Sequence, residues 1–426
     1  MRVLLISVNT EQINMAVLPL GLACIAAASQ QAGHRVKFVN LMSRQNMNEE
    51  IEQTIHAFEP EVIGISVRNI DDQVMNDPTF LLDLVREVVK ECRNLSRSPI
   101  VLGGAGYSIF PREVLEYLDA DFGIQGEGEA VFVSLLNEIA RGGEPRKIPG
   151  VLVRGAAEIS PPRRIKSLDL LPLPLPNVLM GSSDAYGSEE VWLPFQTRRG
   201  CPMNCSYCST AAIEGQIIRK RSPAKVVESL ASFAAAGFDR FFFVDNTFNL
   251  PPSYAKELCQ RLVAAKLSIS WRCILYPHRI DEALIAKMAE AGCKEVSLGF
   301  ESGSIKMLRS MNKKFEPEEV RHISKLLKKY GVRTMGFLLL GGPGETKETV
   351  EESFSFADSL QLDSMKMTVG IRIYPHTLLA RIALREGIIR SIDDLLFPQF
   401  YLEPGIRDWL LERVAAWTKE RPNWHC

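Results

Sequence analysis

The stretch Thr197-Arg-Arg-Gly-Cys-Pro-Met-Asn-Cys-Ser-Tyr-Cys-Ser209 sets Cys201, Cys205 and Cys208 at the spacing C-x3-C-x2-C. Cysteine thiolates bind soft metals and iron–sulfur clusters, and a [4Fe–4S] cluster has four irons to ligate. Three cysteines therefore leave one iron free to bind another group. Two arginines precede the first cysteine, and their charge would favour an anionic cluster.

Other uses of three closely spaced cysteines fit this loop less well. A zinc site typically takes two pairs of ligands, and the chain has no second C-x2-C or H-x3-H pair to complete one. Disulfide pairing would leave one of the three cysteines over. Three unrelated core cysteines are a further alternative, which the regular spacing disfavours.

The motif, with the aromatic Tyr207 just before its last cysteine, resembles the signature of the radical S-adenosylmethionine (radical SAM) superfamily. In that family the amino and carboxylate groups of SAM bind the fourth iron. An electron from the cluster then cleaves SAM to a 5′-deoxyadenosyl radical. The resemblance implies that the three cysteines ligate the cluster and that Tyr207 lies at the SAM site. It also implies an electron donor such as flavodoxin or ferredoxin.

The bulk composition limits the class of protein. The chain has 426 residues, enough for two domains with connections, and its 46% hydrophobic and 24% charged residues are typical of a soluble globular protein. A net charge of −1 provides no basic field for nucleic acid or an anionic membrane. No apolar run is long enough to span a membrane, and residues 1–8 are too short for a signal peptide. Nine cysteines suggest a reducing compartment, so a cytoplasmic location is expected.

Residues 1–145 alternate short apolar runs with amphipathic segments. This alternation is typical of a parallel, doubly wound (Rossmann-like) α/β sheet. In such sheets ligands bind beyond the carboxyl ends of the strands. The predicted strands are Val3–Val8, Val36–Leu41, Val62–Val67, Ile100–Gly104 and Phe122–Gln125, and the predicted helices lie near Leu18–Ala32, Asn48–Phe58, Pro78–Cys92, Pro111–Leu118 and Ala130–Arg141.

Three loops at that edge of the predicted sheet are candidates for ligand binding. Gly103-Gly-Ala-Gly106 and Gly126-Glu-Gly128 are rich in glycine, which lets a large planar ligand approach the backbone. Neither is a G-x-G-x-x-G dinucleotide fingerprint, so the glycines could equally do no more than turn the chain. The third loop is Ser66-Val-Arg-Asn-Ile-Asp-Asp72.

This region resembles the cobalamin-binding domain that precedes the radical SAM domain in many enzymes. The matching residues are Pro19-Leu-Gly-Leu22, Gly33-His-Arg-Val36, Gly103-Gly104, Pro111 and Gly126-Glu-Gly-Glu129. The D-x-H-x-x-G motif of methionine-synthase-type domains is absent, so no histidine is expected below cobalt. The resemblance implies a cobalamin site formed by Leu20, Gly21, Ser66, Arg68, Asn69, Gly103, Gly104, Ala105, Gly106, Tyr107, Gly126, Glu127 and Gly128.

By the same resemblance, Arg68 lies at the lower face of the corrin ring. A guanidinium group stays protonated and cannot coordinate cobalt. Its charge would favour electron-rich, four-coordinate cob(I)alamin. The alternative is a salt bridge from Arg68 to Asp71 or Asp72 on a solvated loop.

A proline-dense stretch follows the first region. Ser160–Arg164 and Leu170–Pro176 favour extended conformations, so residues 146–189 are predicted to be a linker. Residues 190–386 contain six strand–helix units, which predict a partial (β/α)6 barrel with its chemistry at the carboxyl ends of the strands. Residues 387–426 are predicted to form a short helical C-terminus. The predicted barrel strands are Val191–Gln196, Phe241–Val244, Ser270–Leu275, Glu295–Phe300, Thr334–Leu340 and Lys366–Ile373.

Polar residues and glycines cluster at the ends of these barrel strands. A carboxylate there suits ribose hydroxyls, and glycines let a sugar or adenine approach the backbone. The segments resemble the SAM-binding segments of the superfamily, which implies a ribose contact for Glu301, although each residue alone could instead cap a helix. The implied SAM-binding set is Tyr207, Asp245, Glu301, Gly341, Gly342 and Arg372.

Other reactive side chains receive weaker interpretations. Cys24, Cys259 and Cys293 are expected in the core, Cys273 could face the barrel interior, and Cys426 lies at the terminus. Four residues near strand ends could be acids or bases or ordinary loop residues, so no catalytic residue is assigned. They are Tyr276, His278, Tyr374 and His376.

The two resemblances together predict a cobalamin-dependent radical SAM enzyme with a [4Fe–4S] cluster, SAM and cobalamin. It would methylate an unactivated carbon of a small molecule through methylcobalamin and a 5′-deoxyadenosyl radical. The alternatives are a cyclisation or rearrangement without methylation, and a polar methyl transfer without a radical. A redox sensor or carrier is a further alternative, against which the SAM-binding set counts.

Overall fold

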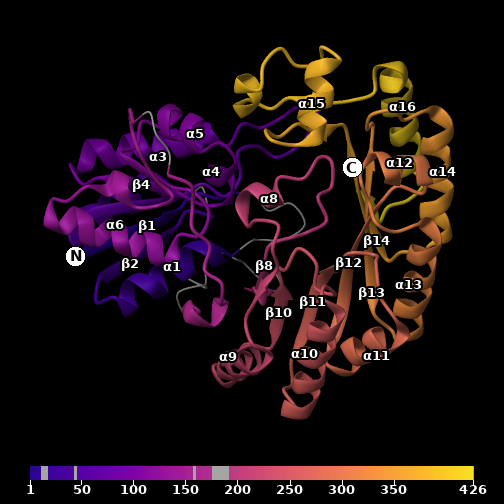
Figure 1. The fold of residues 1–426 in the computed structure, drawn as a ribbon, viewed down its shortest axis with the longest axis horizontal. Helices are drawn as coiled ribbons and strands as arrows, with labels where there is room; N and C mark the ends of the chain where they lie inside the picture. The colour runs from indigo at the N-terminus through magenta and orange to yellow at the C-terminus, as the bar shows by residue number, and fades with distance from the viewer. Residues whose placement is uncertain (11–17, 43–45, 157–159, 175–190, 426) are drawn as a thin grey trace. The chain divides into compact units, whose positions relative to one another are not determined.

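The computed structural model describes residues 1–10, 18–42, 46–156, 160–174 and 191–425 (Figure 1). Part of the predicted linker, residues 175–189, and Cys426 lie outside the described residues. The chain divides into two compact units. The first comprises Met1–Asp72, Pro78–Val191 and Ala212–Glu214, and the second comprises Gln73–Asp77, Trp192–Ala211 and Gly215–Cys426.

The first unit is built on a six-stranded sheet with the strand order β2-β1-β3-β4-β5-β6. The first five strands are parallel, and β6 pairs antiparallel with β5. The strands are β1 (Arg2–Ser7), β2 (Arg35–Asn40), β3 (Val62–Ser66), β4 (Ile100–Gly103), β5 (Phe122–Ile124) and β6 (Val151–Val153). All five predicted strands are present, which confirms the doubly wound α/β prediction, and β6 was missed.

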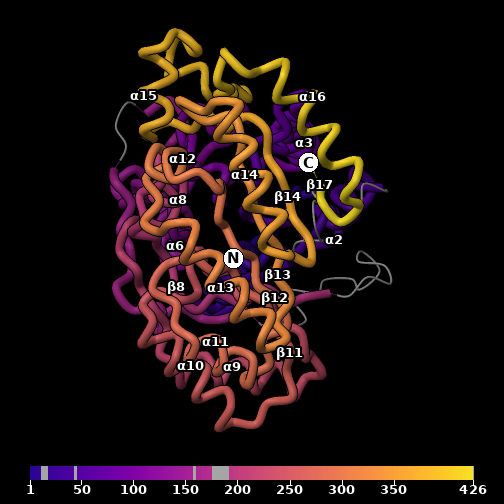
Figure 2. The backbone as a smooth tube through the Cα atoms, turned by 90° about the vertical axis from the view of Figure 1, so that its right-hand side faces the viewer, coloured from indigo at the N-terminus to yellow at the C-terminus, as the bar shows by residue number. Residues whose placement is uncertain are grey.

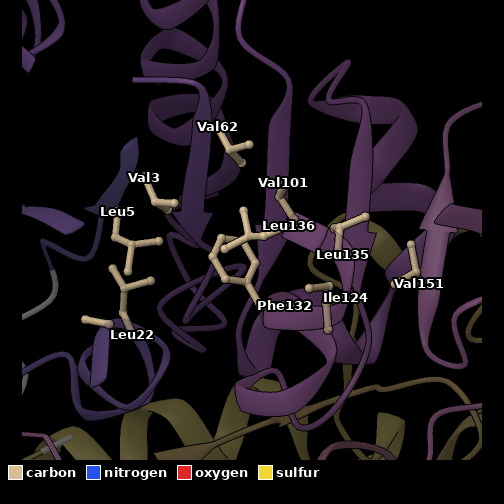
Figure 3. Close-up of a cluster of buried hydrophobic side chains, with 11 residues drawn as sticks. Val3, Leu5, Leu22, Val62, Val101, Ile124, Phe132, Leu135, Leu136 and Val151 are labelled. Atoms are coloured by element: carbon tan, nitrogen blue, oxygen red, sulfur yellow. The ribbon is translucent and has the colours of Figure 1, made fainter. Parts of the chain in front are cut away.

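Helices cover both faces of this sheet, because residues 3–7 of β1 are all buried although consecutive side chains point to opposite sides. One face packs on α1 and α6: Val3 and Leu5 join Leu22 and Phe132 in one apolar cluster (Figure 3). On another part of the unit, α2 packs against α3. The helices are α1 (Leu20–Gln31), α2 (Met47–Phe58), α3 (Leu82–Leu95), α4 (Ala105–Ile109), α5 (Pro111–Tyr117) and α6 (Glu129–Arg141).

The second unit is built on a seven-stranded parallel sheet with the order β17-β14-β13-β12-β11-β10-β7. Among the described residues, its first and last strands do not pair with each other, so the barrel is partial, as predicted. The strands are β7 (Leu193–Phe195), β10 (Arg240–Phe243), β11 (Ser270–Leu275), β12 (Cys293–Glu301), β13 (Arg333–Leu340), β14 (Ser364–Val369) and β17 (Trp424–His425).

The sixth predicted barrel strand is interrupted. Gly370 has a φ of +77°, a conformation that favours glycine, and it ends β14. The chain then enters β15 (Ile371–Arg372), which pairs antiparallel with β16 (Phe400–Tyr401). The break redirects Arg372 away from the parallel sheet.

Helices alternate with these strands, and Figure 2 shows α11, α13 and α14 lying over the strands of the sheet. Side-chain caps define several helix starts: Asp281 accepts a hydrogen bond from the backbone N–H of Leu284, and Thr377 accepts one from that of Ala380. The helices are α8 (Thr210–Ile213), α9 (Pro223–Ala235), α10 (Pro252–Ala265), α11 (Glu282–Glu290), α12 (Ile305–Ser310), α13 (Pro317–Lys329), α14 (Lys347–Ser359), α15 (Leu378–Arg385) and α16 (Arg407–Thr418).

The predicted helical C-terminus is α16, and it packs on α14. Trp417 stacks on Phe354 with ring centroids 3.9 Å apart, and Arg413 forms a bidentate ion pair with Glu351. Aromatic stacking and a two-bond ion pair both fix the helix in register. No helix in the described part of the chain is both long and apolar enough to cross a membrane.

Candidate functional site

The cysteine loop begins at the end of β7 and passes through a small hairpin of β8 (Arg198–Arg199) and β9 (Arg219–Lys220). The backbone N–H of Cys201 donates to the carbonyl of Gly215 at 3.0 Å. Gly200 has a φ of +93°, and a Cβ there would lie 2.2 Å from the carbonyl oxygen of Ile217. This position therefore requires glycine, which explains the Gly-Cys turn at the first predicted ligand.

Asp245, just after β10, anchors the start of this loop. Its carboxylate accepts the backbone N–H groups of Thr197 at 2.7 Å and Arg198 at 3.0 Å, and the Thr197 hydroxyl at 2.5 Å. Burial raises the pKa of Asp245, and the Arg198 guanidinium beside it opposes that effect. The sequence analysis predicts that Asp245 contacts SAM. In the structure, the hydrogen bonds of Asp245 hold the cysteine loop. A contact with SAM stays a prediction.

Glu301 and Tyr207, two of the predicted SAM contacts, lie together beside the cysteines. The Tyr207 hydroxyl donates to Glu301 Oε1 at 3.0 Å. Glu301 has a φ of +63° and follows an irregularity in the pairing of β12 with β13. Such backbone strain in a non-glycine residue is often associated with function.

Lys313 completes this group, and sequence reasoning missed it. Its ammonium donates to the Tyr207 hydroxyl at 2.9 Å and to Glu301 Oε1 at 3.1 Å. Burial acts to lower the pKa of Lys313, but Glu301, Tyr207 and Cys205 outweigh it and raise the pKa. Lysine 313 follows α12 and carries no motif of its own, so no signal in the sequence marked it.

The donor chemistry of the loop fits a [4Fe–4S] cluster. No group of three potential ligands in the described ranges converges closely enough to hold a single metal ion. A cluster makes a different demand, because each cysteine binds a separate iron. Cys201, Cys205 and Cys208 form no disulfide with another described residue, and they are partly exposed thiols on one short loop. Burial raises the pKa of Cys205, and the nearby Lys313 ammonium opposes this by favouring the thiolate.

The glycine segment after β13 is organised by Glu345. This buried carboxylate accepts the backbone N–H groups of Gly341 and Gly342 through Oε2, while its Oε1 has no hydrogen-bond partner among the residues that the structure describes. Burial raises the pKa of Glu345 to about 7. Gly341 has a φ of +91°, and a Cβ there would lie 2.2 Å from Leu402. Close packing accounts for this glycine, and a SAM contact at Gly341 and Gly342 stays a prediction.

Arg372, the last predicted SAM contact, binds backbone carbonyl groups. Its Nη1 donates to Ile373 at 2.8 Å, and its Nη2 donates to Leu395 at 2.9 Å and Leu396 at 3.3 Å. These bonds hold the segment between α15 and β16. The structure therefore gives Arg372 a role in fixing the backbone, and a contact between Arg372 and SAM stays a prediction.

In the first unit, a cavity lies at the carboxyl ends of β1 and β3. Asn69 Nδ2 and Asn9 Oδ1 lie 3.5 Å apart across part of it. The polar residues that line it are Asn9, Thr10, Ser66, Arg68 and Asn69, and the apolar ones are Val8, Leu81, Leu84 and Val85. The structure thus brings three predicted cobalamin residues, Ser66, Arg68 and Asn69, into one cavity.

Arg68 is exposed and makes no ion pair with any described residue. The alternative prediction, a salt bridge to Asp71 or Asp72, is therefore not observed. Asp72 instead accepts the backbone N–H of Thr79 at 3.1 Å, and Asp71 is buried. Desolvation by the surrounding protein lowers the pKa of Arg68. Arginine side chains nevertheless stay protonated in proteins.

The loop of Gly103–Gly106 packs onto the loop that carries Arg68. The backbone N–H of Gly106 donates to the Arg68 carbonyl at 2.9 Å. Gly104 has a φ of +109°, and a Cβ there would lie 2.5 Å from the Val67 carbonyl oxygen. These glycines therefore let two backbone segments approach each other.

Other predicted cobalamin residues have further roles in the fold. Tyr107, two residues after Ala105 in α4, is fully buried, with its hydroxyl against Gly123. Glu127 accepts the backbone N–H of Ile165 at 3.0 Å. The remaining predicted residues lie at two helix starts, with Leu20 and Gly21 in the first turn of α1 and with Gly126 and Gly128 just before α6.

The other reactive side chains divide into core and loop residues. Cys24, Cys259 and Cys293 are buried, as expected, and so is Cys273. The Tyr276 hydroxyl accepts the backbone N–H of Lys314 at 2.9 Å, close to the Lys313 group. The Nδ1 atom of His278 lies 3.6 Å from Oε1 of Glu319. No acid or base is thereby assigned.

Comparisons with known proteins find relatives for both the first unit and the unit that carries the cysteine loop. The chain matches the radical SAM superfamily over residues 196–357 and the B12 binding domain over residues 6–136. It is 29% identical to an uncharacterized methyltransferase of Pyrococcus horikoshii (92% of this chain, 85% of the relative). It is 24% identical to the tryptophan 2-C-methyltransferase of Streptomyces laurentii (88% and 73%). A structure of the radical S-adenosylmethionine methyltransferase TsrM of Kitasatospora setae, with tryptophan and a SAM analog, has the same fold (TM-score 0.84, 22% identity, 95% and 86% covered).

Proposed function

We propose that this chain, which joins a B12 binding domain to a radical SAM domain, is a cobalamin-dependent methyltransferase that methylates a carbon atom of a small molecule. The observation that carries the proposal is the anchored three-cysteine loop beside the Tyr207–Glu301–Lys313 group. A cavity at the strand ends of the first unit supports it independently. Relatives along most of the chain are named as methyltransferases.

Each cofactor has residues whose chemistry fits it. Cys201, Cys205 and Cys208 would ligate three irons of a [4Fe–4S] cluster, and Tyr207 and Glu301 would border the SAM site. When bound, the cluster and SAM supply one-electron chemistry and a methyl group, and cobalamin carries that group to the substrate. The chain's own part is to orient these groups and to exclude water from the reacting atoms.

Arg68 would face the corrin ring from below. Its guanidinium lies free of ion pairs within the described residues and lines the same cavity as Ser66 and Asn69. Because it stays protonated, it would hold the lower position without ligating cobalt. Asn9 and Asn69 would then supply amide groups at the rim of the ligand.

The substrate class proposed here is a small molecule, which is supported by tryptophan bound in the similar structure. The finer part of the proposal concerns the carbon atom that is methylated. This carbon would be unactivated, and a 5′-deoxyadenosyl radical would remove its hydrogen. A small electron-transfer protein such as flavodoxin or ferredoxin would reduce the cluster. The eight described cysteines form no disulfide with one another, which supports a reducing compartment, the cytoplasm.

The test is an anaerobic absorbance spectrum of the reconstituted chain after incubation with hydroxocobalamin and desalting. Retained corrin bands, equimolar with the chain, are expected. Mass spectrometry after addition of SAM and dithionite should then detect S-adenosylhomocysteine, with 5′-deoxyadenosine if the radical route holds. Loss of all corrin beside an intact cluster would overturn the methyl-transfer proposal and leave a radical SAM enzyme with a different first domain.

A further inference from the structure

Polar atoms from three separate segments of the second unit form a closed triangle. Glu301 Oε1 lies 3.0 Å from the Tyr207 hydroxyl and 3.1 Å from Lys313 Nζ, and the hydroxyl lies 2.9 Å from Nζ. Tyr207 belongs to the cysteine loop, Glu301 ends β12, and Lys313 follows α12. The hydrogen-bond roles are complementary, because the phenol has one proton to donate to the carboxylate and the ammonium donates to both oxygens.

Lys313 is enclosed, whereas Glu301 retains an open side. The Lys313 side chain is 4% exposed, and that of Glu301 is 16% exposed. Burying an ammonium is costly unless it is paired, and the Tyr207 ring, whose centroid lies 5.2 Å from Nζ, adds a cation–π contact to the ion pair. The accessible part of the pair is therefore mainly the carboxylate.

The two oxygens of the Glu301 carboxylate have different surroundings. Oε1 accepts both hydrogen bonds of the triangle, whereas Oε2 accepts none from any residue in the described ranges. A carboxylate offers roughly four acceptor sites, and the triangle uses those of Oε1. The sites of Oε2 remain available to a ligand that donates hydrogen bonds.

The backbone that follows Glu301 is fastened to α14. The hydroxyl oxygens of Ser302 and Ser353 lie 2.8 Å apart, and the backbone N–H of Gly303 donates to the Ser353 hydroxyl at 3.1 Å. Both serines are fully buried. Because the backbone is held in this way, the direction of the Glu301 carboxylate depends on its two partners in the triangle.

We propose that Lys313 is a positioning residue for SAM, which holds Oε1 of Glu301 so that Oε2 can accept hydrogen bonds from the ribose hydroxyl groups. The inference rests on the proposed function, because it presumes that SAM binds beside the cysteine loop. Hydrogen bonds to a charged acceptor are stronger than those between neutral groups, so a carboxylate fixed in one direction favours a ligand with hydroxyl groups at that place. Tyr207 shares the triangle, so the same lysine also ties the ribose contact to the cysteine loop.

The test is anaerobic equilibrium dialysis of the reconstituted chain against SAM and against the analogue of SAM whose ribose lacks both hydroxyl groups. The cluster is kept oxidised and cobalamin is left out, so that dialysis measures binding and no turnover. The parent should bind SAM about tenfold more tightly than the analogue. In Lys313→Met, binding of SAM should weaken about tenfold, because the carboxylate loses its main anchor. Binding of the analogue should stay within about twofold of the parent, because it has no hydroxyl contact to lose.

Lys325→Met is the matched control, because Lys325 is exposed on α13, and this variant should bind both compounds as the parent does. An equal loss of affinity for both compounds in Lys313→Met would indicate a structural role and overturn the inference. Unchanged binding of SAM would overturn it as well. The same holds if the parent binds the two compounds equally, since no ribose contact would then exist.

A second variant covers the case in which Lys313→Met loses its cluster. Lys313→Gln is uncharged and one atom shorter, so it cannot hold Oε1 as the ammonium does, and its preference for SAM over the analogue should also shrink. An unchanged preference would overturn the inference. Loss of iron from both variants, but not from Lys325→Met, would overturn it in favour of a role in assembling the cluster. A parent chain that retains its cluster and binds neither compound would refute the proposed function itself.

Discussion

Arg198 and Asp245 form an ion pair that is buried directly before the cysteine loop. Arg198 Nε lies 3.2 Å from Asp245 Oδ2, and the two side chains are 1% and 0% exposed. The guanidinium also stacks between aromatic rings, 5.1 Å from Phe248 and 4.5 Å from Tyr254. A carboxylate at the end of β10 therefore determines where the chain enters the loop that carries Cys201.

Asp245→Asn should destabilise the second unit and lower the iron content after reconstitution. The change leaves the Arg198 charge buried without a counter-charge, and breaking a buried pair costs about 3–5 kcal/mol. Urea denaturation of the cluster-free chain measures the stability, and an iron assay measures loading.

Glu228→Gln provides the control for Asp245→Asn, because Glu228 forms an exposed pair with Lys225. Exposed pairs contribute at most about 1 kcal/mol. If both variants unfold at the parental urea concentration, Asp245 does not anchor the loop. An Asp245→Asn chain that is less stable but binds iron fully would show that the anchor serves folding alone.

The sequence predicted most strands of both sheets, because their apolar runs are short and separated by amphipathic helices, but it missed the short strands β6 and β17. It could not show which way a strand-end side chain points. Glu301 ends β12 and Asp245 lies just after β10, yet the Asp245 carboxylate holds the start of the cysteine loop and Glu301 lies beside Tyr207. Both were assigned to SAM on the same ground, and only the structure separates them.

Residues that act through tertiary contact were also beyond the sequence. Lys313 meets Tyr207 across 106 positions of the chain, and no local pattern records such a contact. The glycines of Gly103–Gly106 were visible as a motif, but a motif does not show whether a ligand or another backbone segment occupies the space beside them. In the structure, the segment at Val67 and Arg68 takes that space at Gly104 and Gly106.

Cys205→Ala should abolish cluster assembly, since only two of the three predicted cysteine ligands would remain. The measurement is iron and sulfide content, together with the absorbance of the reconstituted chain. Cys92→Ala is the control: Cys92 is fully buried in the first unit, and its loss creates only a small cavity. Unchanged iron in Cys205→Ala would contradict the assignment of the loop as the cluster site.

Arg68→His should alter the absorbance spectrum of bound cobalamin. Unlike a guanidinium, a neutral imidazole can coordinate a metal, so a histidine at the lower face would add an axial ligand. The spectrum should respond to pH as the imidazole is protonated near its usual pKa of about 6.5.

Arg97→His is the matched control for Arg68→His, because Arg97 is exposed elsewhere in the same unit. It should leave the cobalamin spectrum unchanged. A spectrum of Arg68→His that equals that of Arg97→His at every pH, with the same amount of corrin bound, would place Arg68 away from cobalt.

Glu345→Gln should remove part of the pH dependence of stability. Burial raises the pKa of Glu345 to about 7 from an ordinary value of 4.5. Between those pH values the folded state holds a proton that the unfolded state has released. Stability from this group is therefore full below about pH 4.5 and is lost as the pH rises through 7, by about 3 kcal/mol.

The measurement is the urea midpoint of the cluster-free chain at several pH values from 5 to 8, compared between the parent and Glu345→Gln. Glutamine can still accept the backbone N–H groups of Gly341 and Gly342, so the variant should lose less stability than the parent as the pH rises. Glu352→Gln, on the exposed side of α14, should follow the parent. Parallel curves for all three chains would mean that Glu345 is ionised throughout this range, with the two glycine N–H groups outweighing its burial.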